Sequence, residues 1–157
     1  MNKTNVMRIL DKAKIPYGVA EYSKELTEGV LIAETLNEDK DRVFKTLVTE
    51  AASGAHYVFV IPVAETLDLK AAARAVNEKS VSMLKQKELL PMTGYIHGGC
   101  SPIGMKKPFK TVIDVKARSF EEFFVSAGRV GLQIKLSPVL LAELIGADFC
   151  NISIKVD

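Results

Sequence analysis

The sequence contains no tryptophan, and aromatic residues make up only 7% of its 157 residues. The hydrophobic core is therefore expected to be mainly aliphatic. The sequence also has only two cysteines, Cys100 and Cys150, which are too few for a disulfide framework. We expect both to be reduced thiols in a cytosolic protein, because disulfides are rare in that compartment.

Long apolar segments are absent as well. The longest apolar run covers residues 57–64, far short of the roughly 20 residues that a membrane-spanning helix requires. The start of the chain lacks the apolar centre of a signal peptide, so we expect a cytoplasmic protein with no membrane partner. The formal net charge of +2 neither indicates nor excludes a nucleic-acid partner, because a local basic patch can occur on a nearly neutral protein.

The composition that is present, 48% hydrophobic and 25% charged residues, is typical of a globular protein. The length suits one compact domain over residues 1–157, large enough to fold without a disulfide or a metal. The two histidines, His56 and His97, are far apart in sequence, and there is no Cys-x-x-Cys motif. We therefore expect neither a metal site nor another cofactor.

Hydrophobic periodicity and capping residues predict several helices. They are expected at residues 4–13, 29–36, 69–76 and 139–146. A further helical turn is expected at 85–90 and should end at Pro91, since proline disrupts a helix interior. Thr4, Asp68 and Ser137 are the expected N-caps, and Pro138 suits the first position of the last helix.

Alternating and β-branched residues predict strands. They are expected at residues 17–22, 42–51, 56–62, 80–84, 94–99, 111–115, within 120–128, and at 131–136 and 148–154. Ser53 and Gly54 predict a turn that joins the second and third strands in a hairpin. Because helices and strands intermix without a strict β-α-β repeat, we predict a mixed α+β domain, with a strongly curved, barrel-like sheet and helices outside it.

The segment GGCSPIGMKK, residues 98–107, has the glycine spacing of a nucleotide-binding P-loop but lacks its other residues. Met105 stands where the lysine of that loop belongs, and a strand pattern follows where a helix is required. We therefore reject a nucleotide hydrolase. The adjacent Lys106 and Lys107 either contact a phosphate or mark the solvated end of a loop, and the sequence favours neither.

Cys100 lies in the same segment, three residues after His97. A nucleophilic cysteine usually has a base or a cation beside it, but in an extended segment His97 would point away from Cys100. We favour a small thiol that fills a tight loop over a catalytic one. Gly98 and Gly99 indicate that a ligand approaches the backbone closely there, where their N–H groups would bind an oxyanion or a carbonyl.

Lys45 lies between aliphatic residues in the expected strand VFKTLV, residues 43–48. Side chains alternate along a strand, so Lys45 shares one face with Val43 and Leu47, and Thr46 lies on the other. Either the lysine extends past the sheet to solvent or it is partly buried. A buried lysine has a lowered pKa or an anionic partner, and both are typical of binding and catalytic lysines.

The glycine-rich segment SAGRVGLQ, residues 126–133, lies between two expected strands. It is either a bulged hairpin or a stretch in which Ser126 and the backbone around Gly128 line a pocket. Asp114 and Gln133 are polar residues within apolar strands. Such residues are more often hydrogen-bonded in the core than catalytic, and we predict that role for Asp114.

Taken together, residues 43–48, 94–107 and 126–134 resemble the YbaK/EbsC family, which is related to the editing domain of bacterial prolyl-tRNA synthetases. The resemblance rests on a lysine within a strand, the motif G-G-x-S-P-x-G-x-K-K and the motif S-x-G-x-x-G-L, and it extends over nearly the whole chain. It implies a barrel-like mixed sheet surrounded by helices. It also implies a trans-acting deacylase that clears mischarged tRNA, chiefly cysteinyl-tRNA bearing the proline acceptor.

By the same resemblance, Lys45 is the key functional residue, which contacts the tRNA 3′ end and helps to place the ester. Tyr22, Thr46, Gly98 and Ser126 match further pocket positions of the family. No protein nucleophile is implied, because the substrate's own thiol attacks its ester carbonyl while the protein holds both groups in place. The implied partners are the acceptor end of an aminoacyl-tRNA and a prolyl-tRNA synthetase.

Two positions depart from the family pattern. Gln133 replaces an aspartate of the cysteine-specific members, as in a branch labelled EbsC-like, and Glu28 stands near the place of an aromatic residue. Both positions lie at the expected edge of the pocket, so we count Gln133 among the substrate-binding residues. These departures leave the aminoacyl specificity open, and a deacylase for alanyl-tRNA is one alternative. The others are a non-catalytic module that binds aminoacyl-tRNA or a synthetase, and a thiol-dependent enzyme that uses Cys100.

Overall fold

The computed structural model describes residues 2–22, 34 and 40–155 of the chain. The helix expected at residues 29–36, together with Glu28, lies outside the described residues except for Glu34. The helices of the described part are α1 (Asn5–Lys12), α3 (Leu69–Ala75), α4 (Gln86–Thr93) and α5 (Pro138–Ile145), with 3-10 turns η1 (Lys40–Arg42) and η2 (Val115–Ser119).

Three of these helices begin where their capping side chains predict. The side chains of Thr4, Asp68 and Ser137 each accept a hydrogen bond from the backbone N–H three residues later, at 3.3, 3.1 and 3.2 Å. Each cap satisfies a donor that the helix itself leaves unpaired. Pro138 occupies the first position of α5, where its missing N–H is not needed. The expected starts of α1, α3 and α5 are confirmed.

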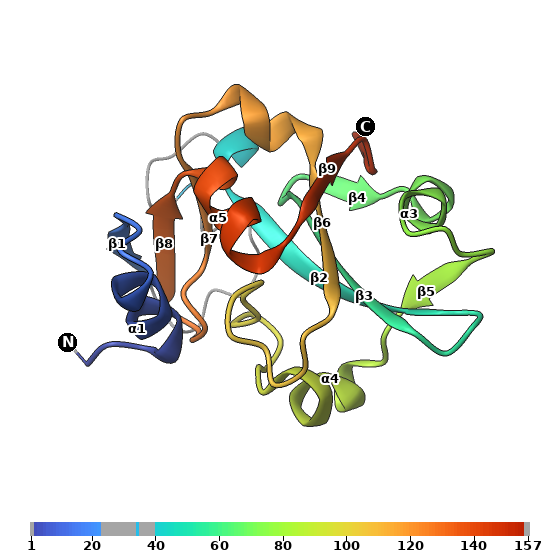
Figure 1. Ribbon diagram of the computed structural model, residues 1–157, viewed down its shortest axis with the longest axis horizontal. Coiled ribbons are helices and arrows are strands. Elements are labelled where there is room, and N and C mark those ends of the chain that lie inside the picture. Colours follow the sequence, from blue (N-terminus) through green and yellow to red (C-terminus); the bar gives the residue numbers. More distant parts are fainter. Residues whose placement is uncertain (1, 23–33, 35–39, 156–157) are drawn as a thin grey trace.

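The strands are short except for one central pair. They are β1 (Gly18–Glu21), β2 (Phe44–Ala51), β3 (His56–Pro62), β4 (Glu65–Leu67), β5 (Val81–Met83), β6 (Lys110–Asp114), β7 (Phe123–Ser126), β8 (Leu132–Leu136), β9 (Asp148–Cys150) and β10 (Ser153–Lys155). In Figure 1 the β2–β3 hairpin crosses the middle of the molecule, with α1, β1 and β8 to one side and α3, β4 and β5 to the other.

The largest sheet has five strands in the order β5-β2-β3-β6-β9. β2 pairs antiparallel with β3 along the predicted hairpin and with β5, whereas β6 pairs parallel with β3 and β9 pairs parallel with β6. This mixture of strand directions, with helices packed against it, confirms the predicted mixed α+β fold class.

The expectation of a barrel is wrong in one respect, because the strands do not close into a single sheet. β1-β8-β7 form a separate three-stranded sheet, and β10-β4 form a two-stranded one. The five-stranded and three-stranded sheets meet at a single parallel bridge between Val43 and Phe124. The ladder does not continue beyond this pair, so β2 and β7 remain unpaired with each other along their lengths.

The main core lies between the two larger sheets and the helices α1 and α5. Val6, Met7 and Leu10 of α1 and Leu141 of α5 are buried in it together with the inner residues of the strands. The core is largely aliphatic, as expected, although Phe44 and Phe123 add an edge-to-face pair with ring centroids 5.0 Å apart. A second cluster lies under α3.

The segment between residues 85 and 99 differs from its prediction. α4 continues through Pro91 to Thr93, and no strand forms at 94–99. Pro91 removes only the one intrahelical bond to the Lys87 carbonyl, and Thr93 adds a hydroxyl bond of 2.7 Å to the Leu89 carbonyl. The alternation in GYIHGG that predicted a strand is broken by Gly94 and Gly98, whose φ angles of 83° and 87° bend the chain into a loop.

Two smaller differences concern strand ends. The segment expected as one strand at 148–154 is divided into β9 and β10, which belong to different sheets. β4 was not expected, because three residues are too few for a visible alternation. The remaining strands lie within the expected ranges or within a residue of them.

Candidate functional site

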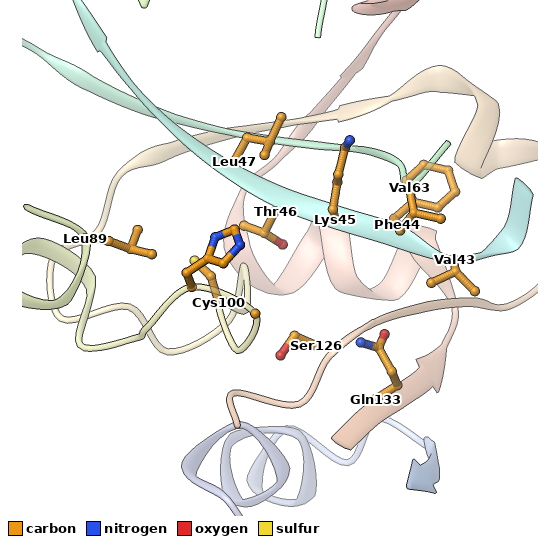
Figure 2. A pocket seen from close by; sticks show the side chains of 12 residues that line it. Val43, Phe44, Lys45, Thr46, Leu47, Val63, Leu89, Cys100, Ser126 and Gln133 are labelled. Atoms are coloured by element: carbon orange, nitrogen blue, oxygen red, sulfur yellow. The ribbon is translucent and has the colours of Figure 1, made fainter. Parts of the chain in front are cut away.

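A cavity of about 150 Å³ lies beside β2. Its walls come from β2, from the loop after α4 and from β7 and β8 (Figure 2). The lining residues are Val43, Phe44, Lys45, Thr46, Leu47, Val63, Leu89, His97, Gly98, Cys100, Ser126 and Gln133. We call this space the β2–β7 cavity. It brings together the three segments that the sequence analysis grouped.

The position of the β2–β7 cavity follows from the way the two sheets meet. β2 is paired with β3 on one edge over its whole length, but on the other edge β5 pairs only with residues 49–51. Toward β7 there is only the bridge from Val43 to Phe124. The residues after this bridge, 44–47, all line the cavity. The β2–β7 cavity thus occupies the gap between the five-stranded and the three-stranded sheet, next to the bridge that joins them.

Lys45 is half-buried in the wall of the cavity. Burial lowers the pKa of its ammonium group, because a charge loses hydration there. No ion pair or hydrogen bond of this ammonium is present within the described residues. Figure 2 shows Lys45 and Thr46 leaving β2 in opposite directions, as strand alternation predicts, with Thr46 on the side of Ser126. Lys45 is therefore a partly desolvated cation without a counter-ion among the described residues, and of the two alternatives that the sequence left open, partial burial is the one found.

Three buried side-chain oxygens have no hydrogen-bond partner within the part of the chain that the structure describes. They are the hydroxyls of Tyr22 and Thr46 and the carbonyl oxygen of Gln133. Thr46 and Gln133 line the β2–β7 cavity, while Tyr22 lines a neighbouring hollow of about 140 Å³ beside residues 129–132. Such atoms are rare because each costs about 1–3 kcal/mol. All three belong to the residues that the sequence analysis assigned to a substrate pocket.

Asp114 and Gln133 differ, although both are polar residues within apolar strands. Asp114 is fully buried and accepts hydrogen bonds from three donors, so its predicted role is confirmed. Gln133 is also buried, with 5% of its surface exposed, but its carbonyl oxygen has no partner among the described residues and the side chain lines a cavity. Its role in binding a substrate stays a prediction.

Ser126 faces the cavity from β7 and pairs with Gln133 across the strand ladder. Its hydroxyl oxygen accepts the N–H of Gly128 at 3.1 Å, which leaves the hydroxyl proton available to a ligand. Gly128 itself does not line the cavity. A side chain on Gly128 would come within 3.0 Å of Val6 and 3.1 Å of Tyr95, so this glycine packs behind Ser126 and holds it in place.

Gly98 and Gly99 are also separated by the structure. Gly98 lines the cavity, and its N–H has no acceptor among the described residues. Gly99 lies behind it and donates its N–H to the carbonyl of Ile96 at 3.0 Å. A side chain on Gly99 would lie 2.9 Å from the backbone nitrogen of Val130, so glycine is required where the two loops touch. The expectation that both N–H groups face a ligand is wrong for Gly99, and only Gly98 retains that role.

Cys100 and His97 both line the cavity, contrary to the expectation that His97 points away. The expectation assumed a strand at 94–99, and the glycine-bent loop replaces it. No hydrogen bond joins the two side chains. Burial raises the pKa of the Cys100 thiol to about 12, so the group is a protonated thiol at neutral pH. This agrees with a thiol that fills space and disagrees with a nucleophile.

We accordingly expect Cys100→Ser to retain the aminoacyl-tRNA cleavage that the family resemblance implies, to within about 3-fold, since a thiol with so high a pKa contributes almost no thiolate at neutral pH. The measurement is kcat/KM on aminoacyl-tRNA for the wild-type chain and the variant at equal folded concentration. Cys150→Ser is the matched control, because Cys150 lies on β9 and does not line the cavity. A loss of 100-fold or more in Cys100→Ser alone would establish a thiol-dependent enzyme.

Lys106 and Lys107 lie apart from the β2–β7 cavity. Both are exposed, and Lys107 borders a separate hollow of about 280 Å³ between residues 102–111 and the end of α5. Their contact with a tRNA phosphate stays a prediction. The turn that precedes them is fixed from within, because the Tyr95 hydroxyl donates to the carbonyl of Ile103.

Two cations that the sequence analysis did not single out lie next to the cavity. Ser126 pairs with Gln133, and two residues further along the ladder Phe124 pairs with Lys135. Alternation places Lys135 on the same face as Gln133, about 7 Å away along the strand. The Nζ atom of Lys135 and the guanidinium of Arg42 lie 6.0 and 5.9 Å from the centre of the Phe124 ring. The alternation in LQIKL could have indicated Lys135 from the sequence.

The described residues contain no group of three or more histidine, cysteine or acidic side chains that could hold a metal ion. Within the same residues, no helix is both long and apolar enough to cross a membrane.

Comparison with protein families adds a direct relationship. A family model described as the aminoacyl-tRNA editing domain matches residues 30–144, which include β2, the loop of residues 94–107 and the β7–β8 hairpin. A protein of Enterococcus faecalis named "Putative Cys-tRNA(Pro)/Cys-tRNA(Cys) deacylase EbsC" is 43% identical over 155 residues. The match covers 98% of this chain and 94% of that protein.

Solved structures share the fold. The crystal structure of hypothetical protein APE2540 has a TM-score of 0.89 at 22% identity, covering 96% of this chain and 100% of the other. The structure of "a putative trans-editing enzyme for prolyl tRNA synthetase" has a TM-score of 0.83 at 21% identity, covering 98% and 99% of the two chains. These likenesses concern the fold, and together with the family match they agree with the resemblance found from the three segments.

Proposed function

Because this chain belongs to the aminoacyl-tRNA editing domain family, we propose that it is a deacylase that cleaves misacylated tRNA in trans, acting most readily on cysteinyl-tRNA. The observation that carries the proposal is the β2–β7 cavity, whose described lining includes the half-buried Lys45 and the side-chain oxygens of Thr46 and Gln133, which have no partner among the described residues. A bound aminoacyl ester, with its amine, carbonyl and neighbouring ribose and phosphate, offers partners for all of these groups.

The size of the cavity suits the aminoacyl group and not a whole nucleotide. A protein cavity of roughly 150 Å³ holds a ligand about as large as benzene, whereas larger organic ligands occupy roughly 300–1,000 Å³. A cysteinyl or alanyl group would fill the β2–β7 cavity, and the terminal adenosine would lie at its mouth. There the ammonium of Lys45 suits the ribose and phosphate of the 3′ end, and the cations Lys135 and Arg42 suit the phosphates that follow.

For a cysteinyl ester the proposed reaction needs no protein nucleophile. The sulfur of the substrate thiol attacks the ester carbonyl carbon, the bond from this carbon to the tRNA oxygen breaks, and the thiol proton ends on that oxygen. The products are free tRNA and the thiolactone of cysteine. Holding the two reacting groups of an activated ester together supplies much of the acceleration. The free N–H of Gly98 would donate to the carbonyl oxygen as it gains charge.

A panel of misacylated tRNAs tests the proposed function. The purified full chain is incubated with cysteinyl-, alanyl- and seryl-tRNA of the proline acceptor type, and loss of the aminoacyl group is measured. We expect the cysteinyl ester to be cleaved at least about 10-fold faster than the seryl ester, because a hydroxyl is a much weaker nucleophile than a thiol at neutral pH. If the alanyl ester is cleaved preferentially, the proposed thiol-assisted mechanism is wrong and the reaction is a hydrolysis by water, because an alanyl group carries no thiol.

Survival of all three esters would contradict the proposal, and tight tRNA binding without cleavage would favour a binding module. A second arm adds prolyl-tRNA synthetase, which we propose as a partner that presents the tRNA. The net charge of only +2 motivates this arm, because it gives the chain little electrostatic attraction of its own for a whole tRNA. Acceleration of cleavage by the synthetase is the expected result, and an unchanged rate would remove the partner from the proposal.

A further inference from the structure

Gln133 is the side chain of the β2–β7 cavity whose placement the proposed reaction does not yet explain. It lies on β8 opposite Ser126 of β7 and Ala20 of β1, and 5% of its surface is exposed. Ala20 offers no side-chain donor, and the Ser126 hydroxyl, whose oxygen accepts the N–H of Gly128, makes no hydrogen bond to Gln133. Among the described residues the carbonyl oxygen of Gln133 is thus a buried acceptor without a donor, on the wall of a cavity (Figure 2).

The charged groups that the described residues place around the cavity are cationic. The titratable side chains of the lining are Lys45 from β2 and His97 and Cys100 from the loop after α4, while Ser126 and Gln133, which β7 and β8 contribute, do not titrate. Lys135 lies on the same face of β8 as Gln133. No aspartate or glutamate belongs to the described lining. A positively charged ligand group would therefore enter a cavity with cations around it and with no carboxylate among the described residues to balance it.

We infer that the carbonyl oxygen of Gln133 accepts a hydrogen bond from the α-amino group of the aminoacyl ester, and that this amine is bound as the uncharged base. The inference rests on the proposed function and names how that same cavity recognises its substrate. An amine is the donor that every aminoacyl ester carries next to the scissile carbonyl. In a cavity whose described lining holds a lysine and no carboxylate, the neutral amine enters at lower electrostatic cost than the ammonium form.

The test removes the amine from the substrate and the acceptor from the protein separately. The substrates are cysteinyl-tRNA and 3-mercaptopropionyl-tRNA, which keeps the thiol and the ester but lacks the amine. We expect the wild-type chain to prefer the cysteinyl substrate by at least about 10-fold in kcat/KM, the effect of one buried hydrogen bond. In Gln133→Leu we expect that preference to fall to about 2-fold. Gln86→Leu, an exposed glutamine at the start of α4, is the matched control and keeps the wild-type preference.

A second variant tests the charge state of the amine. Gln133→Glu places a carboxylate where the ammonium form would pair with it. The ratio of kcat/KM of this variant to that of the wild type should therefore rise as the pH falls from about 8 to 6, across the range in which α-amino groups gain a proton. A ratio that does not change with pH would overturn the inference that the wild-type cavity binds the amine in its uncharged form.

The possible failures are distinguishable. If the wild-type chain cleaves cysteinyl-tRNA but Gln133→Leu keeps the full preference for the amine, the role of Gln133 is wrong and the proposed deacylase stands. If the wild-type chain cleaves neither substrate nor any ester of the panel, the proposed function itself fails. Both variants are checked by thermal unfolding, and Gln133→Leu should be no less stable than the wild type, because it removes an unpaired buried oxygen.

Discussion

Lys45→Ala is expected to lower kcat/KM for aminoacyl-tRNA by about 10²–10³-fold, the range found when one charge-stabilising group is removed from an active site. The reason is that Lys45 is the only lysine or arginine in the described lining of the β2–β7 cavity, and its ammonium is partly desolvated with no counter-ion on the residues that the structure describes. A phosphate or a developing oxyanion of the substrate would supply that counter-ion. Deacylation kinetics under single-turnover conditions measure the effect without interference from product release.

Two further variants show which property of Lys45 matters. Lys45→Arg keeps a cation that cannot lose its proton, so we expect it to recover a large part of the activity if the role is charge, and none if the role is proton transfer. Lys110→Ala is the control for removing a strand lysine, because Lys110 lies at the start of β6 and pairs with Asp148 at 3.4 Å. Equal losses in Lys45→Ala and Lys110→Ala would mean that a general tRNA attraction is measured.

The same lysine should reduce the stability of the free protein. Its pKa is lowered on folding, so between the folded-state pKa and 10.5 the unfolded chain binds more protons, and stability rises with pH across that window. Below it the charged form is buried at a cost. We therefore expect Lys45→Met to be more stable than the wild type at neutral pH, by up to about 1 kcal/mol or roughly 2–4 °C in Tm. The difference should shrink as the pH approaches 10.5, and thermal unfolding at several pH values measures it.

Much of the site could be predicted from local patterns, because local patterns decide which face of a strand a residue occupies. The alternation in VFKTLV was sufficient to place Lys45 and Thr46 on opposite faces, and the glycines of residues 98–104 and 126–131 marked the loops that border the cavity. The three N-caps were predictable for the same reason, since each depends on a bond only three residues long.

The features that could not be predicted depend on contacts between distant segments. Whether Gln133 finds a partner is decided by the gap between β2 and β7, which no pattern within β8 reveals. Gly98 and Gly99 are equivalent in sequence, but the approach of residues 129–130 turns one toward the cavity and the other into a loop contact. The failure of the sheets to close into a barrel also depends on distant segments. It is decided by whether the pairing of β2 with β7 continues beyond the single bridge between Val43 and Phe124.

The C-terminal part of the fold depends on a buried polar network on the side of the five-stranded sheet that carries β4 and β10. Asp114, at the end of β6, accepts the N–H groups of Lys116 at 2.9 Å and Ile152 at 3.1 Å and the hydroxyl of Ser153 at 2.7 Å. The Nζ atom of Lys116 in turn donates to Glu65 of β4 at 2.9 Å. One carboxylate thereby joins three segments that are far apart in the sequence.

Asp114→Ala is expected to destabilise the protein by about 3–5 kcal/mol, because it leaves the buried N–H of Ile152 and the partly buried N–H of Lys116 without their acceptor and removes the charge that faces Lys116. For a chain of this length the loss corresponds to a fall in Tm of roughly 10 °C. Asp148→Ala is the matched control on the neighbouring strand β9. Its side chain is 63% exposed and its pairing with Lys110 is solvent-screened, so we expect a change below about 1 kcal/mol.

Activity separates this structural role from a role in the site. None of the four network residues, Glu65, Asp114, Lys116 and Ser153, lines the β2–β7 cavity. At a temperature well below its own Tm, the folded Asp114→Ala protein should therefore cleave aminoacyl-tRNA with a kcat/KM close to that of the wild type. Lys45→Ala should be fully folded but show the loss of about 10²–10³-fold. An Asp114→Ala protein with an unchanged Tm and a lost activity would reverse this assignment, because it would show that the carboxylate acts on the site and not on the stability of the fold.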